Sequence, residues 1–150
     1  MPIPSLHHLH HECLLCGQDD RLGLNLRFQS CADGLWAWVV LDHRHQGYHR
    51  IGHGGLTAAL LDAVMTNCLL RRGIEALTAA LQIRFRAPAP LHTPLLLRAR
   101  LQRQRRRHHL LCASLHHDDH LLAEAEGRFM STLGAPEAQD DVVADQEPCP

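Results

Sequence analysis

The hydrophobic pattern of the chain singles out one long apolar stretch, residues 52–72, between stretches of alternating residues. Three glycines and a histidine open it, and good helix formers follow, with Asp62 as the one carboxylate inside the run. A helix that is apolar on nearly every side is buried in a fold rather than laid on its surface. Arg71, Arg72 and Gly73 suit its end, because cations favour the C-terminal dipole and glycine favours the residue after the helix. We therefore predict one buried helix that keeps a single carboxylate.

Six segments alternate between apolar and polar residues, which is the period of a strand with one buried face. Two precede the helix, at residues 24–28 and 35–41, and four follow it, at residues 81–85, 97–101, 110–116 and 123–129. Short connections imply antiparallel neighbours, and only one long helix exists to cover the sheet. We predict an α+β fold in which an antiparallel six-stranded sheet wraps around one long central helix.

The composition indicates one domain, at residues 21–134, because 150 residues are too few for two comfortable ones. Residues 1–20 are irregular and histidine-rich. Residues 135–150 hold five acids and no base, which predicts a disordered acidic tail. No apolar run is long enough to span a membrane, and the start lacks a signal peptide. We therefore expect a cytoplasmic protein without a membrane partner.

The charged and sulfur-containing residues exclude several classes of chemistry. All fifteen basic residues are arginines, so catalysis by a Schiff-base lysine is excluded. The folded part carries only a modest positive charge and few aromatic residues, which argues against a nucleic-acid partner. The six cysteines have no small-domain disulfide spacing. Cys68 in the helix and Cys112 in a strand are expected to be reduced core thiols.

The element order, with His53-Gly54-Gly55 opening the helix and Leu61-Asp62 inside it, resembles the hot-dog fold acyl-CoA thioesterases. The nearest branch is the phenylacetate-pathway-like and 4-hydroxybenzoyl-CoA-thioesterase-like one. Further matching points are Cys13-Leu-Leu-Cys16-Gly17 followed by Gly23-Leu24, the Gly47-Tyr48 loop, and Arg84-Phe85-Arg86-Ala87-Pro88. The resemblance covers residues 13–133. It implies a hydrolase that acts on acyl-CoA as a homodimer or homotetramer, with paired sheets and an active site at the subunit interface.

Thioester hydrolysis needs a group that polarises the carbonyl and a base or nucleophile that brings in water. The backbone N–H of Gly54 is our choice for the first, and Asp62 for the second. The two lie about 12 Å apart along one straight helix, at ~1.5 Å per residue. One carbonyl can meet both only if they come from two chains, which predicts obligate self-association. The structural alternative for Asp62 is a hydrogen bond to a neighbouring hydroxyl such as Thr66.

Two further candidates for the catalytic machinery have simple structural alternatives. His53 could orient the loop, contact the thioester or only cap the helix. Thr78 matches a position where relatives carry a hydroxyl that positions the water, but a threonine at the start of a strand is also explained by propensity.

Candidate substrate-binding residues lie near the predicted mouth of the site. A polar group in the loop before the helix would be Gln46, and Gly55 adds a second glycine at the helix start. Arginines would suit the phosphates of coenzyme A, or could be ordinary solvated residues. The candidates are Arg84, Arg86 and Arg106 of the 105–107 turn.

Cys13-x-x-Cys16, with histidines at positions 7, 8, 10 and 11, raises a zinc hypothesis, because four nitrogen or sulfur ligands suffice. No second pair follows downstream, so we expect no metal and no cofactor. Two alternatives to the thioesterase remain open: a hydratase or dehydratase of the same fold, and a non-catalytic acyl-CoA-binding protein. The acyl group is not readable from the sequence.

Overall fold

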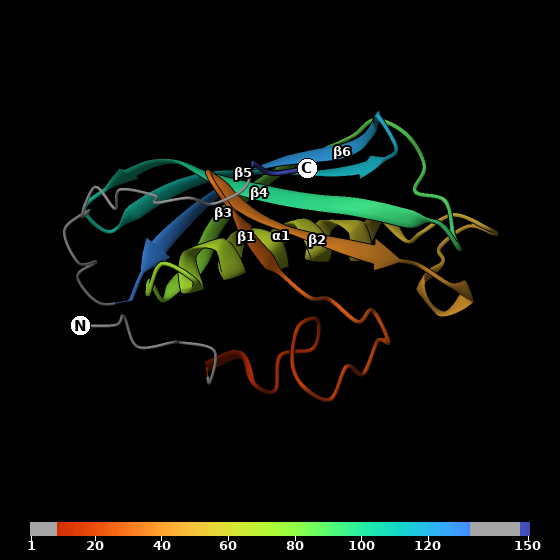
Figure 1. Ribbon diagram of the computed structural model, residues 1–150, viewed down its shortest axis with the longest axis horizontal. Coiled ribbons are helices and arrows are strands. Elements are labelled where there is room, and N and C mark those ends of the chain that lie inside the picture. Colours follow the sequence, from red (N-terminus) through yellow and green to blue (C-terminus); the bar gives the residue numbers. More distant parts are fainter. Residues whose placement is uncertain (1–8, 133–147) are drawn as a thin grey trace.

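The computed structural model describes residues 9–132 and 148–150. One helix, α1 (Gly54–Leu70), packs against a six-stranded antiparallel sheet in the order β1-β2-β4-β5-β6-β3 (Figure 1). The strands are β1 (Gln29–Cys31), β2 (Gly34–Val40), β3 (Ala76–Phe85), β4 (Pro94–Arg105), β5 (His108–His117) and β6 (His120–Ser131), and a short 3-10 helix, η2 (His43–His45), precedes α1. The predicted hot-dog architecture is confirmed. The predicted disordered tail, residues 135–150, lies outside the described residues except for residues 148–150.

The core lies between α1 and the concave face of the sheet. Ten of the seventeen residues of α1 are buried, so the helix is buried on most of its circumference, as predicted. Alternate residues of the strands meet it, for example Leu35, Ala37 and Val39 of β2. The less buried positions include Asp62 and Thr66, one turn apart, so a single stripe of the helix escapes full burial.

The first predicted strand, residues 24–28, is wrong: β1 begins only at Gln29. Asn25 has a left-handed backbone, with φ of 49°. The Asp20 carboxylate accepts hydrogen bonds from the backbone N–H groups of Leu24 and Asn25, at 2.9 and 3.1 Å. These bonds replace a strand ladder. The alternation in the sequence reflects one-sided packing of Leu24, Leu26 and Phe28 against the core.

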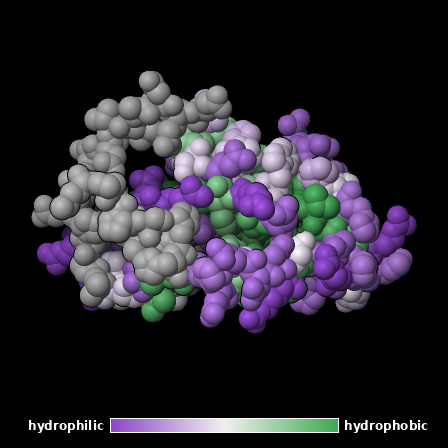
Figure 2. All heavy atoms as spheres, turned by 60° about the horizontal axis from the view of Figure 1, so that its bottom comes forward, coloured by the Kyte–Doolittle hydropathy of each residue, from purple (hydrophilic) through white to green (hydrophobic). Residues whose placement is uncertain are grey.

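The N-terminal segment, residues 9–28, runs along the side of α1 that the sheet leaves uncovered (Figure 1). The buried ring of His45 fixes it, since its Nε2 donates to the Leu22 carbonyl and its Nδ1 accepts from the Asp42 N–H at 2.9 Å. Figure 2 shows the molecule with the side of the N-terminal segment turned forward, where hydrophobic residues are exposed among polar ones. The segment is therefore part of the domain and borders the helix that carries Asp62.

β3 is an edge strand. It begins at Ala76, five residues before the predicted start, and pairs with β6 on one side. Within the described residues no strand pairs with its other side. Residues 77–80 are exposed, including Leu77 at 67%. An exposed row of backbone donors and acceptors is a template for pairing with another chain.

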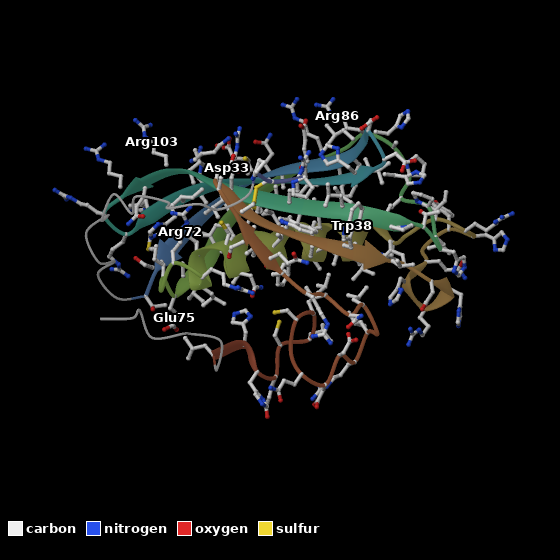
Figure 3. All side chains as sticks on the ribbon, viewed as in Figure 1. Asp33, Trp38, Arg72, Glu75, Arg86 and Arg103 are labelled. Carbon is white, nitrogen blue, oxygen red and sulfur yellow. A yellow bond between two sulfur atoms is a disulfide. The ribbon has the colours of Figure 1, made fainter. Side chains whose placement is uncertain are left out.

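The cysteines differ in part from the expectation. Cys68 and Cys112 are free thiols, as predicted, but only Cys68 lies in the core, because Cys112 is partly exposed on the outer face of the sheet. Cys31 of β1 is joined by a disulfide to Cys149, and the bond lies beside Asp33 (Figure 3). The two residues are 118 positions apart, so no local spacing marks the pair.

Among the described residues, no helix is long and apolar enough to cross a membrane.

Candidate active site

Asp62 of α1 and Thr78 of β3 form a direct contact. The Thr78 hydroxyl donates to Oδ1 of Asp62 at 2.6 Å. Asp62 projects from the less buried stripe of the helix, toward the edge strand, and remains half-buried rather than sealed in the core. The hydroxyl predicted as the alternative partner, that of Thr66, is not the one that Asp62 binds. The structure thus brings together two of the predicted catalytic residues within one chain.

The start of α1 presents a free backbone donor. His53 is the N-cap, and its Nδ1 accepts from the Gly55 N–H at 2.9 Å. His53 therefore caps the helix, and the Gly55 N–H is already hydrogen-bonded to it. The Gly54 N–H, at the first helical position, has no partner in the part of the chain that the structure describes. The positive end of the helix dipole lies at this N–H.

Gly54 opens onto a cleft of about 860 Å³. The cleft lies between the loop before α1, the end of β3 and the loop after it. Predicted site residues in its lining are Gln46, His53, Gly54 and Arg86. Gln46 uses its Oε1 to accept from the Arg50 N–H at 3.2 Å, which holds its side chain on the loop. Neither Asp62 nor Thr78 lines the cleft.

The arginines are distributed over different surfaces. Arg86 lines the cleft and forms an ion pair with Glu124, with Nε 3.2 Å from the carboxylate. This guanidinium holds the pKa of the Glu124 carboxyl below its usual range. Arg84 instead lines a depression of about 620 Å³ formed by β3 to β6 on the outer face of the sheet. Arg106 lies in the β4–β5 turn with φ of 53°. Of the three, only Arg86 meets the cleft.

Sequence reasoning missed two aromatic residues of the cleft, Tyr48 and Phe85. Tyr48 is 87% exposed and Phe85 is 57% exposed, and both line the cleft. Phe85 also approaches the helix start, since a Cβ built on Gly54 would lie 3.8 Å from its ring. Both residues lie in segments that the sequence analysis had matched to the family, the Gly47-Tyr48 loop and the run around Phe85, and this match could have marked them as candidates. An apolar wall beside a free N–H suits a bound acyl or thioester group.

Residues 49–124, a little more than half of the chain, match the sequence profile of the thioesterase superfamily. This chain belongs to the thioesterase superfamily. The matched stretch includes the helix start, Asp62, Thr78 and Arg86, whereas Gln46 lies just before it. No curated protein matches the chain.

Solved structures of this superfamily share the fold. Protein RHA08564, a thioesterase superfamily protein, is 28% identical with a TM-score of 0.72, over 76% of this chain and 60% of that one. A hypothetical thioesterase of Streptococcus pneumoniae TIGR4, solved with coenzyme A, is 16% identical with a TM-score of 0.69, over 73% and 90%. The smu.793 protein of Streptococcus mutans UA159, bound to acetyl CoA, is 19% identical with a TM-score of 0.68, over 73% and 90%. At these identities the two streptococcal structures show the shared fold alone.

The S. pneumoniae protein was also solved as two single variants. In one an aspartate is replaced by alanine, and in the other a threonine is replaced by alanine. The two positions are sixteen residues apart, and Asp62 and Thr78 of this chain are also sixteen residues apart.

Proposed function

We propose that this chain is an acyl-CoA thioesterase whose active site forms between two subunits. One subunit supplies Asp62 and Thr78, and its partner supplies the Gly54 N–H and the cleft around it. The observation that carries the proposal is the 2.6 Å hydrogen bond from Thr78 to Asp62. This hydrogen bond orients Asp62, the single carboxylate of an apolar helix, on the less buried side of that helix. A substrate bound in the cleft of the partner subunit could reach the carboxylate there.

The proposed chemistry divides between the two halves. The Gly54 N–H donates to the thioester carbonyl oxygen and stabilises the negative charge that develops there. Asp62 either takes a proton from the attacking water or attacks the carbonyl carbon itself to give a mixed anhydride that water then hydrolyses. In both routes the C–S bond breaks, and coenzyme A leaves as a thiolate that then takes up a proton. Thr78 holds the carboxylate in position.

The separation of the two halves supports a site built from two chains. Asp62 is absent from the lining of the cleft onto which Gly54 opens, and eight helical residues separate the two by about 12 Å. The free edge of β3, the strand that carries Thr78, provides a surface for pairing with a second copy. We propose this edge as the dimer contact.

The chemistry of the cleft and two relatives support a coenzyme A ester as the substrate. The streptococcal structures were solved with coenzyme A and with acetyl CoA. In this chain Arg86 places a guanidinium at the cleft, where it could meet a phosphate. The match in spacing between Asp62 and Thr78 and the two substituted streptococcal positions supports the choice of these residues as the catalytic pair.

A panel of acyl-CoA esters with detection of the released thiol tests the proposal on the full chain. We expect release of coenzyme A that is lost in Asp62→Asn while the fold is retained. Binding of acyl-CoA without thiol release would identify a non-catalytic binding protein instead. Hydration of an enoyl-CoA without thiol release would identify a hydratase. Sedimentation at low concentration tests the assembly, because a fully active monomer contradicts a two-chain site.

A further inference from the structure

The N-terminal segment gathers one nitrogen and two sulfur atoms that could bind a metal beside α1. Nδ1 of His10 and the Sγ atoms of Cys13 and Cys16 lie within 4.8 Å of one another, with His10 Nδ1 3.5 Å from Cys16 Sγ. The other such group in the described residues, Cys31 with Asp33 and Cys149, has its two sulfurs joined in a disulfide. The cluster around Cys13 is therefore the one with its thiols available.

The backbone of residues 13–17 forms a tight turn around the two cysteines, which we call the knuckle. The Gly17 N–H donates to the Cys13 carbonyl at 2.8 Å. A Cβ at Gly17 would lie 2.4 Å from that carbonyl oxygen, so only glycine fits there. The tight turn therefore brings the two thiols close together.

A side chain of the helix holds the second sulfur. Asn67 is 4% exposed, and its Nδ2 donates to the Ala63 carbonyl at 2.8 Å and to Cys16 Sγ at 3.4 Å. A buried amide that donates to a cysteine sulfur is the kind of outer contact that orients metal ligands. It also ties the knuckle to α1, five residues after Asp62.

The geometry points to a zinc site formed by His10 Nδ1, Cys13 Sγ and Cys16 Sγ, which fixes the N-terminal segment against α1. Two thiolates and an imidazole select zinc over magnesium or calcium. Ligand sulfurs of a tetrahedral zinc lie about 3.8 Å apart, given Zn–S bonds of about 2.3 Å. The observed spacings therefore need only side-chain shifts of about 1 Å or less. The fourth position is open to water or to a further side chain.

Binding of the ion has a structural consequence and a chemical one. Because the ligands come from one short segment and Cys16 is held by Asn67, the ion would lock that segment onto the helix and stabilise the folded chain. Because zinc binds cysteine in the thiolate form, uptake of the ion displaces thiol protons. Neither consequence depends on thioester hydrolysis.

Metal analysis of the full-length protein tests the site. The chain is purified in reductant, stripped of metal, titrated with Zn²⁺ or Co²⁺ and analysed for bound metal. We expect one ion per chain, with a sulfur-to-cobalt charge-transfer band in the Co²⁺ form. Cys13→Ser and Cys16→Ser should lose the ion, and Asn67→Leu should weaken binding by about tenfold or more. Cys112→Ser removes a free thiol of β5 and should bind as the unaltered protein does.

A second measurement needs no variant and so does not depend on whether a variant folds. Alkylation of the native protein is followed by mass spectrometry with and without Zn²⁺. We expect Zn²⁺ to protect Cys13 and Cys16 but not Cys112. Failure of the reduced protein to take up stoichiometric metal overturns the proposal. So does equal alkylation of Cys13 and Cys16 in the presence and absence of Zn²⁺, or undiminished binding by a folded Cys13→Ser variant.

Discussion

The variant Gly54→Pro tests the proposed oxyanion donor independently of the other groups of the site. Gly54→Pro removes one backbone N–H and leaves every side chain in place. The helix tolerates it, because proline is favoured at the first helical position and that N–H has no intrahelical partner. His53 already has the extended backbone that precedes a proline, with φ −62° and ψ 128°. A Cβ at position 54 meets nothing nearer than the Phe85 ring, at 3.8 Å.

The expected effects on stability and activity have opposite signs. A proline that fits its backbone reduces the entropy of the unfolded chain and stabilises by about 0.4–1 kcal/mol. Loss of one oxyanion donor costs about 2.7–4 kcal/mol in the transition state, a fall of about 10²–10³ in kcat. Gly54→Ala is the matched control, because it keeps the N–H and its Cβ has room. A variant that melts higher and turns over far more slowly is the signature of a lost donor.

Mixing two inactive variants then tests whether the site spans two chains. Gly54→Pro and Asp62→Asn homodimers each lack one half of every site. In a mixed dimer one site receives both defects and the other receives none, so random exchange should restore about a quarter of the unaltered activity. The assay is thiol release after the two proteins have been mixed under conditions that permit subunit exchange. Unchanged kcat in Gly54→Pro refutes the donor, and no recovery on mixing refutes the two-chain site.

Three smaller predictions concern the surroundings of the site. Thr78→Val removes a hydrogen bond to a carboxylate worth about 1.5 kcal/mol at this exposed position, so kcat/KM should fall about tenfold, with no further loss in the Asp62→Asn background. Arg86→Ala should raise KM for acyl-CoA by up to about fivefold, but leave KM for acyl-pantetheine, which lacks the nucleotide phosphates, unchanged. His109 is buried, and neither ring nitrogen has a partner among the described residues. Burial lowers its pKa from 6.5, so the unfolded chain binds the proton more readily than the folded one. The folded state is therefore expected to lose stability as pH falls below about 6.5. His109→Leu should melt higher, by a margin that widens toward acid pH in a thermal scan.

Each of these has a control and a contradicting result. Thr66→Val removes a hydroxyl one turn from Asp62 and should keep full activity, whereas additive losses in the double variant would mean that Thr78 does not act through Asp62. Arg84→Ala should leave KM unchanged, since Arg84 lies outside the cleft, and an equal rise in KM for acyl-pantetheine would remove the phosphate role of Arg86. A melting difference independent of pH would show that protonation of His109 does not limit acid stability.

Features set by neighbouring residues were predictable from the sequence. The helix begins at Gly54 because the His53 side chain accepts from the Gly55 N–H, and it ends before Gly73, which has φ of 73°. Both signals lie within a few residues of the feature they mark. The alternation that predicted a strand at residues 24–28 was a weaker guide, because it records which side chains face the core. It does not record whether the backbone has a ladder partner.

Contacts between distant segments were not predictable in the same way. Asp62 and Thr78 could each be singled out, but their hydrogen bond depends on how β3 crosses the helix. The contact of Asn67 with Cys16 joins residues 51 positions apart. No periodicity or local spacing carries such information, since the pairs are set by tertiary packing.

The disulfide between Cys31 and Cys149 makes a closed covalent ring of most of the chain. The helix α1 and the strands β2 to β6 all lie inside that ring. If the two ends of the molecule are pulled apart, the load passes through the bond from Cys31 to Cys149, and the domain between them is shielded from the force. A proteolytic machine that threads substrates from the C-terminus would meet the ring at Cys149. Reduction of this one bond, rather than unfolding of the sheet, would then be the first step in its mechanical destruction.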